Sequence, residues 1–107
     1  MFYIKAQSFA EAMGYYGYTS GKEEDRKKLF IRDVFPVKRK SDGKQFGYSV
    51  LTQSLGSGVE ARFTVYTREY DKHPIHKGDI IFCDHFVRKG QYFDLMAYRH
   101  LYSSVEL

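Results

Sequence analysis

The sequence predicts an all-β fold, a small five-stranded barrel that is preceded by an N-terminal extension. Apolar and polar residues alternate with a period of two in five short runs between Leu29 and Leu101. Turn residues separate these runs, as they do in small barrels. A chain of 107 residues has room for one domain with one core. We therefore predict a barrel at residues 29–101, an N-terminal arm at residues 1–28 and a C-terminal tail at residues 102–107.

The N-terminal arm differs from the rest of the chain in composition. A capping-box spacing at residues 8–11 predicts a helix of one or two turns. Glycines and a run of charges then interrupt any longer element. We expect the arm to be partly mobile or to pack on the barrel as a flap. Base stacking and self-association are the other roles open to its tyrosines, which are Tyr15, Tyr16 and Tyr18.

The first strand is predicted to begin at Leu29 and to lead into a basic turn. Pro36 has no N–H to donate, so we expect the strand to bend, bulge or run along an edge there. The Asp42-Gly43 pair is a hairpin signal, and the second strand follows over residues 45–52. One face of the first strand is predicted to carry Leu29, Ile31, Phe35 and Val37.

The third strand is predicted over Val59 to Tyr70, where the alternation is clearest. The connection that follows, residues 71–78, is too short for a substantial helix. The polar face of this strand is predicted to carry Arg62, Thr64, Tyr66, Arg68 and Tyr70.

The fourth and fifth strands form a second predicted hairpin, over Asp79–Val87 and Tyr92–Leu101. A basic turn, Arg88-Lys89-Gly90-Gln91, connects them. The apolar face of the fifth strand is predicted to carry Phe93, Leu95, Ala97 and Leu101.

Charge and cysteine content narrow the class of protein. The net charge of +4 favours polyanionic partners, although many basic proteins bind none. The single cysteine, Cys83, rules out an internal disulfide and fits a reducing compartment. The N-terminal residues lack a signal-peptide pattern, and no stretch approaches the length of a membrane span. We expect a soluble cytoplasmic protein with no membrane partner.

Catalytic and metal-binding motifs are absent from the sequence. His73 and His76 lie beside a proline in a predicted loop, and one cysteine cannot complete a structural zinc site. Ser57 lacks the strand-to-helix elbow of a nucleophilic serine. The scattered aspartates form no recognisable pair. We therefore predict a protein that is not an enzyme and that holds no metal or cofactor.

Three short motifs resemble OB-fold domains of the tRNA-anticodon-binding type. Residues 31–34 (Ile-Arg-Asp-Val), followed by a basic turn and residues 47–51 (Gly-Tyr-Ser-Val-Leu), resemble the first hairpin of that family. Residues 77–81 (Lys-Gly-Asp-Ile-Ile) resemble the start of its fourth strand, and residues 92–101 resemble its last strand. The OB domain of bacterial DNA polymerase III alpha subunits is similar. The chain departs from the family at Gln53-Ser54, where an acidic residue is usual, and we expect no helix between strands three and four.

The resemblance implies a five-stranded Greek-key barrel whose ligand lies across strands two and three, between two loops. It implies non-catalytic binding of single-stranded nucleic acid, DNA more than RNA, as an accessory to replication, recombination or repair. The first rim would be Lys38, Arg39, Lys40 and Lys44. The second rim would be Arg88, Lys89 and Gln91. The floor would be Arg62, Tyr66 and Arg68, with Tyr48 as a neighbour if its side chain faces outward.

Two interpretations of this surface stay open at the level of the sequence. Lysine and arginine neutralise phosphates, and tyrosine stacks on unpaired bases. The same residues also make an ordinary solvated face of an antiparallel sheet. The alternative function is an OB-type protein–protein interaction module without a nucleic-acid ligand, with a protein partner or a homo-oligomer. An SH3-like barrel would give a similar strand pattern.

Overall fold

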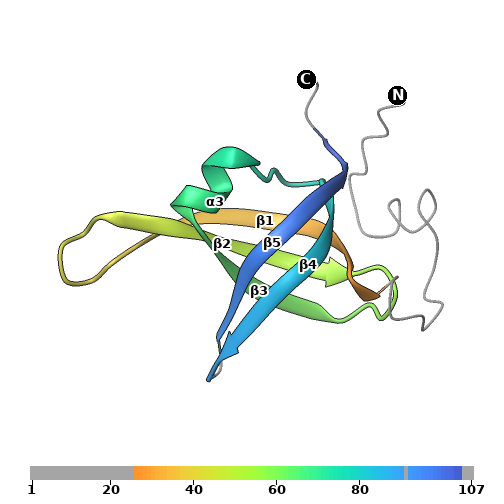
Figure 1. Cartoon of the computed structure of the whole chain (residues 1–107), viewed down its shortest axis with the longest axis horizontal. Helices are drawn as coiled ribbons and strands as arrows, with labels where there is room; N and C mark the ends of the chain where they lie inside the picture. Colours follow the sequence, from red (N-terminus) through yellow and green to blue (C-terminus); the bar gives the residue numbers. More distant parts are fainter. Residues whose placement is uncertain (1–25, 91, 105–107) are drawn as a thin grey trace.

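The computed structural model describes residues 26–90 and 92–104. Five strands form one closed barrel in the order β1-β2-β3-β5-β4 (Figure 1). β1, β2 and β3 form an antiparallel meander, and β4 returns to lie beside β1, which makes the order a Greek key compatible with an OB-like fold. The prediction of an all-β five-stranded barrel is confirmed. The elements are β1 (Lys28–Lys38), β2 (Gln45–Ser54), β3 (Glu60–Tyr66), α3 (Thr67–Lys72), β4 (Ile80–Lys89) and β5 (Tyr92–Tyr102).

The predictions for the N-terminal arm concern residues that lie almost wholly outside the described part of the chain. Only residues 26–28 of the predicted arm are described, and Lys28 is the first residue of β1. At the other end, β5 continues to Tyr102, whose side chain is buried. Among the residues that the structure describes, no helix has the length and apolar character required to cross a bilayer.

A β-bulge in β1 reverses which of its residues point into the barrel. Ile31 pairs with Thr52 and Asp33 pairs with Leu51, so Arg32 is an extra residue on β1. An extra residue moves every following side chain to the opposite face. Val34 accordingly packs against the core. The prediction that Phe35 shares the buried face of Ile31 is therefore wrong, and Phe35 is 44% exposed.

The second half of β1 is an edge, as the proline suggested. β1 pairs with β4 only through Lys28, Leu29 and Phe30, whereas it pairs with β2 as far as Lys38. Residues 33–38 therefore have a strand partner on one side only. Pro36 lies in this segment, where the absence of an N–H costs least and also hinders pairing with another chain.

The chain turns into a helix where the third strand was predicted to continue. The last pair between β2 and β3 joins Gly47 to Tyr66, so residues after Tyr66 have no β2 partner. Thr67–Lys72 forms α3, with Glu69 in its first turn and Lys72 in its last, as the helix dipole favours. The predictions of a strand to Tyr70 and of no helix before the fourth strand are both wrong.

Bulges also change the inward face of β5. Relative to β4, Met96 and Leu101 are extra residues between successive register pairs. Both side chains are exposed, whereas Leu95, Tyr98 and Tyr102 are buried. The prediction that Leu101 faces the core is wrong for the same reason as the prediction for Phe35.

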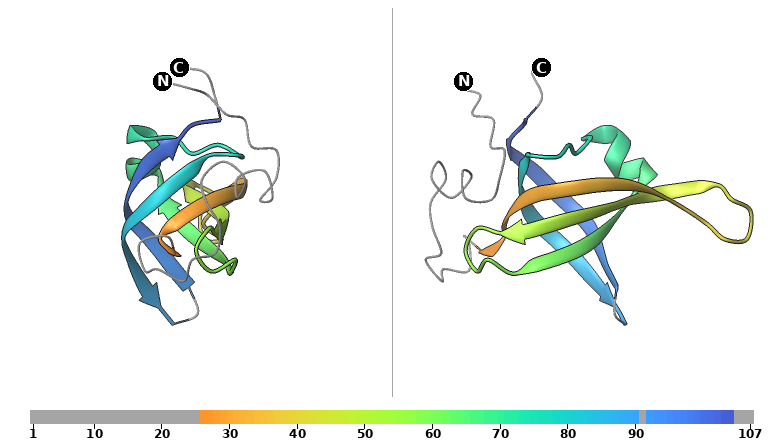
Figure 2. Two further views of the ribbon diagram at one scale, coloured as in Figure 1. Left: turned by 90° about the vertical axis from the view of Figure 1, so that its right-hand side faces the viewer. Right: turned by 180° about the vertical axis from the view of Figure 1, so that it is seen from behind.

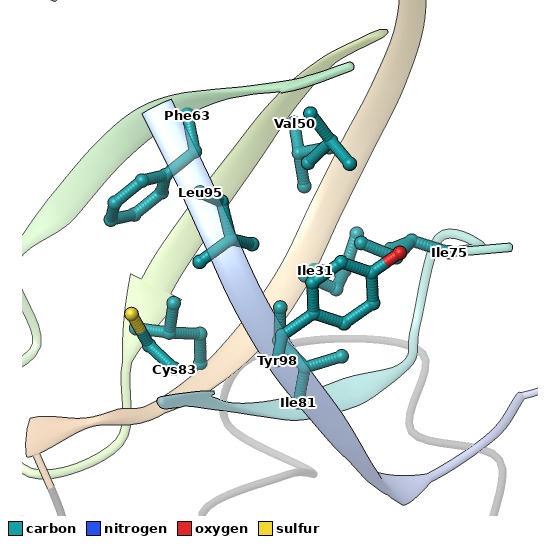
Figure 3. Packing of buried hydrophobic residues seen from close by; sticks show 10 residues of the cluster. Ile31, Val50, Phe63, Ile75, Ile81, Cys83, Leu95 and Tyr98 are labelled. Atoms are coloured by element: carbon teal, nitrogen blue, oxygen red, sulfur yellow. The ribbon is translucent and has the colours of Figure 1, made fainter. Parts of the chain in front are cut away.

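The core fills the barrel (Figure 3), and Tyr70 and Ile75, from α3 and the segment that follows it, contribute to it. Tyr70 of α3 stacks on Tyr48 with ring centres 3.7 Å apart, and its hydroxyl donates to the Ile75 carbonyl at 2.7 Å. The Tyr98 hydroxyl donates to the His73 carbonyl at 2.6 Å. Burial raises the pKa of Tyr98, so this hydroxyl remains a donor. The central residues are Leu29, Ile31, Val50, Phe63, Val65, Ile75, Ile81, Cys83, Leu95 and Tyr98.

A buried carboxylate holds the start of β4 to the end of β5. Asp79 is fully buried and accepts hydrogen bonds from the His76 amide at 2.8 Å and from the Ser104 amide at 2.6 Å. Its Oδ2 also lies 3.0 Å from His100 Nε2. Burial by itself would raise the pKa of Asp79, but the hydrogen bonds from His100, Ser104 and His76 together lower it. This explains the Lys-Gly-Asp motif as a structural anchor.

Candidate nucleic-acid interface

The solvent side of β1, β2 and β3 forms one continuous surface, which we call the outer face. Directly paired residues of an antiparallel sheet point to the same side. The right-hand view of Figure 2 presents these strands toward the reader. Because the registers of β1 with β2 and of β2 with β3 are both defined, the outer face can be written as three rows. The rows are Val37–Gly47–Tyr66, Phe35–Ser49–Thr64 and Asp33–Leu51–Arg62.

Glycine at the centre of the first row is required by the close approach of β2 and β3. A Cβ atom at Gly47 would lie 2.5 Å from the Val65 carbonyl oxygen, which is backbone and cannot move aside easily. Tyr66 stands opposite Gly47, and its ring centre is 6.2 Å from that of Phe46. An aromatic residue opposite a strand glycine shields the exposed backbone there.

The basic turn between β1 and β2 extends beyond the body of the barrel (Figures 1 and 2). Arg39 and Gly43 close the turn, because the Gly43 amide donates to the Arg39 carbonyl at 2.8 Å and Gly43 has a positive φ of 68°. The Arg39 guanidinium lies 2.9 Å from Asp42 Oδ2. Among the described residues, no hydrogen bond or ion pair involves the side chains of the other three predicted rim residues. These are Lys38, Lys40 and Lys44, all exposed.

The basic turn between β4 and β5 is built differently, because its cations are engaged. Arg88 Nε donates to the Gly90 carbonyl at 2.9 Å, and its guanidinium carbon lies 5.7 Å from the centre of the Phe93 ring. Lys89 Nζ lies 3.0 Å from Asp94 Oδ2. Gln91, the third predicted residue of this rim, lies outside the described residues.

Asp94 connects this second turn to the floor of the outer face. Asp94 is only 4% exposed, and its Oδ2 accepts a hydrogen bond from the Tyr66 hydroxyl at 3.1 Å. Burial and this hydrogen bond raise the pKa of Tyr66, and the bond to Asp94 raises the pKa of Lys89. Tyr66 and Lys89 thus both contact the same buried carboxylate. No local pattern of residues signals this role of Asp94, because it depends on pairing between β3 and β5.

The predicted floor residues divide into two groups. Arg62 and Tyr66 both lie on β3 and belong to the outer face. Arg68 lies on α3, so its predicted place on the floor is wrong. Tyr48, whose direction the sequence left open, is half-buried and packs on the core against Tyr70. Pairing with β2 ends at Tyr66, and Tyr70, which is partly buried, packs on the core from α3.

Phe35 is the residue of this surface that the sequence interpretation missed. A signal was available, since Ile31 and Val34 are both apolar and three residues apart. Strict alternation cannot place both on the core, but a bulge between them can. The structure contains that bulge at Arg32, and it brings Phe35 into the same row as Ser49 and Thr64.

Metal ligands and the single thiol bear on other kinds of chemistry. Within residues 26–90 and 92–104, no three His, Cys, Asp or Glu side chains gather as metal ligands would. Burial raises the pKa of the Cys83 thiol to about 11, which keeps it protonated and unreactive. Comparisons of the chain with protein-family models, with curated proteins and with solved structures found no match.

Proposed function

We propose that the protein binds single-stranded nucleic acid, without catalysis, across the outer face of its barrel. DNA is the preferred ligand in this proposal, and the role is accessory to replication, recombination or repair in the cytoplasm. The barrel would then be an OB domain of the tRNA-anticodon-binding type, similar to that of polymerase III alpha subunits. The short motifs at residues 31–34, 47–51 and 77–81 support this family, and the closed Greek-key strand order is compatible with it.

One observation carries the proposal: β3, which carries Arg62 and Tyr66, pairs with the stem of the first basic hairpin and with the start of β5, next to the second basic turn. The turn at residues 38–44 contains four cations and one carboxylate, so its net charge is +3. Cations of this kind bind phosphates with release of counterions. Tyrosine and arginine stack on base faces that are accessible in single strands and hidden in duplexes. The arrangement thus offers both of the contacts that a single strand can make.

Fluorescence anisotropy with labelled oligonucleotides tests the proposal. We expect mixed-sequence single strands to bind with micromolar or lower Kd at low salt, more tightly than duplex, and with affinity that falls as salt rises. Arg62→Ala should weaken binding about tenfold, because it removes a phosphate or stacking contact from the floor. Equal affinity for duplex and single strands, or no binding at low salt, would contradict the proposal.

Lys77→Ala is the matched control for loss of one positive charge. Lys77 precedes β4 and Lys89 ends it, so the ten-residue strand separates Lys77 from the second turn by about 30 Å. We expect this variant to bind oligonucleotides like the wild type. An equal loss of affinity in Lys77→Ala and Arg62→Ala would indicate attraction by net charge alone.

A protein-interaction module is the second candidate function, and one surface favours it. Phe86 is 47% exposed at the end of the barrel near the second turn, where its ring contacts those of Phe63 and Phe93 at 5.9 and 5.8 Å. Exposed aromatic clusters are common anchors of protein interfaces. This candidate predicts that binding to a protein partner survives added salt and is lost in Phe86→Ala. The oligonucleotide proposal predicts neither result.

A further inference from the structure

We propose that Phe35 is a base-stacking platform on β1, so that a bound single strand contacts β1 as well as β2 and β3. This inference rests on the proposed function and extends its site to a residue that the motifs do not identify. Three observations define the direction of Phe35: its exposure, the inward packing of its neighbour Val34, and its pairing with Ser49. Successive side chains of a strand point to opposite faces, so an inward Val34 requires an outward Phe35.

The neighbours of Phe35 suit the flat face of a base. Ser49 and Thr64 continue its row across the sheet, and both are small, so nothing taller than a hydroxyl borders the ring on that side. Val37 and Asp33 flank it along β1. The carboxylate of Asp33 accepts a hydrogen bond from the Val34 amide at 2.9 Å, which holds it to the backbone. Phe35 is 44% exposed, and apart from Asp33 these neighbouring residues are uncharged.

The spacing of the two outer aromatic residues fits contacts with different bases of one strand. Tyr66 is two strands and one row away from Phe35, a separation of about 12 Å between their Cα atoms in a regular sheet. The basic turn at residues 38–44 begins three residues beyond Phe35 on the same strand. A strand stacked on Phe35 would thus have its phosphates within reach of that turn. Charge complementarity makes a polyanion the occupant that this surface fits.

The absence of tryptophan from the chain permits a direct test. Phe35→Trp places one indole on the outer face, and Leu101→Trp places one at a similarly exposed position on β5, 43% against 44% for the native side chains. With an unlabelled oligothymidylate, we expect strong quenching of the indole emission in Phe35→Trp and none beyond the inner-filter effect in Leu101→Trp. Stacking on the base is the physical cause of the quenching.

Affinity measurements complete the test. We expect Phe35→Ala to weaken oligonucleotide binding about tenfold, and Phe35→Tyr, which keeps the ring, to retain nearly full affinity. Circular dichroism melts would show that each variant folds, which an exposed position favours. Wild-type affinity in Phe35→Ala, together with unquenched indole emission in Phe35→Trp, would overturn the inference while leaving the proposed function intact. Failure of the wild-type protein to bind any oligonucleotide would overturn both.

Discussion

The two basic turns of this barrel are alike in composition and different in construction. In the turn between β1 and β2, one cation of four is paired, through Arg39 and Asp42. In the turn between β4 and β5, Lys89 pairs with the buried Asp94, and Arg88 covers Phe93. A lysine whose charge is already balanced by a buried carboxylate contributes little net attraction for phosphate. Within the proposed function, we therefore expect phosphate contacts mainly at the first turn, whereas the cations of the second turn contact Asp94 and Phe93.

The largest effect is expected from a substitution in the stem of the first hairpin. Gly47→Ala would place a Cβ atom 2.5 Å from the Val65 carbonyl oxygen, so β2 and β3 must separate. We expect the free energy of unfolding to fall by about 3 kcal/mol, measured by urea denaturation followed by circular dichroism. Gly43→Ala at the tip of the same hairpin meets no atom within 4 Å and is strained only by its positive φ, so it should cost about 1 kcal/mol. Equal losses would contradict the steric explanation.

The next largest effect is expected from a change to Asp94, the carboxylate that supports the second turn. Asp94→Asn removes a charge that accepts from Tyr66 and pairs with Lys89 in a buried position. We expect a loss of about 2 kcal/mol in the free energy of unfolding, because an amide leaves part of this network unsatisfied. Urea denaturation measures this loss. A loss below about 0.5 kcal/mol, which is typical of surface substitutions, would contradict the conclusion that a buried carboxylate supports the second turn.

Oligonucleotide binding separates the roles of the two turns directly. Lys38→Ala combined with Lys40→Ala should weaken binding about tenfold and reduce the slope of log Kd against log salt by about 1.4, since each phosphate contact contributes about 0.7. The charge-neutral pair Lys89→Gln with Asp94→Asn should leave the slope unchanged. Anisotropy titrations at several salt concentrations measure both, and the reverse ranking would overturn the assignment.

Acid pH changes the stability of the barrel through Asp79, which lies in neither basic turn. The two turns must therefore be compared near neutral pH. The pKa of Asp79 is lower in the folded chain than its ordinary value of 3.8. Its stabilising contribution is therefore complete above that value and is lost as the pH falls from there through the lower folded pKa. We expect the free energy of unfolding to fall as the pH drops through this range. In Asp79→Asn this part of the pH dependence should disappear from urea unfolding curves.

The smallest effect concerns the carboxylate of the first turn. Asp42→Asn removes the exposed pair with Arg39 but keeps an oxygen that can accept from the Lys44 amide. We expect a loss of about 0.5 kcal/mol in the free energy of unfolding, typical of surface pairs. Oligonucleotide affinity should rise slightly, because the turn gains net positive charge. A loss as large as that of Asp94→Asn would remove the contrast between the two turns.

Local patterns in the sequence were sufficient for the number and order of the strands and for the two basic turns, but not for the end of the third strand. The Asp-Gly and Arg-Lys-Gly turns are encoded within a few residues, and the barrel follows from five alternating runs. The direction of Phe35 was not predicted: the spacing of Ile31 and Val34 permits a bulge, but the position of the bulge depends on how Arg32 is accommodated against β2. Tyr70 was assigned to a strand because its contact with Tyr48, across the barrel end, leaves no local trace. Non-local pairing therefore decided the parts of the candidate site that the sequence did not reveal.

The barrel is closed between β3 and β5 by only two parallel pairs, Phe63 with Phe93 and Thr64 with Asp94. β5 inserts between β3 and β4, so the last strand of the barrel to leave the ribosome is the one that completes the ring. A nascent chain that ends after Lys89 presents an unclosed sheet with an unpaired β3 edge, and long-range closure of this kind is slow. We therefore expect a chain that lacks the final strand to be more sensitive to proteolysis, and to associate more readily with other unfinished chains, than the chain that includes it.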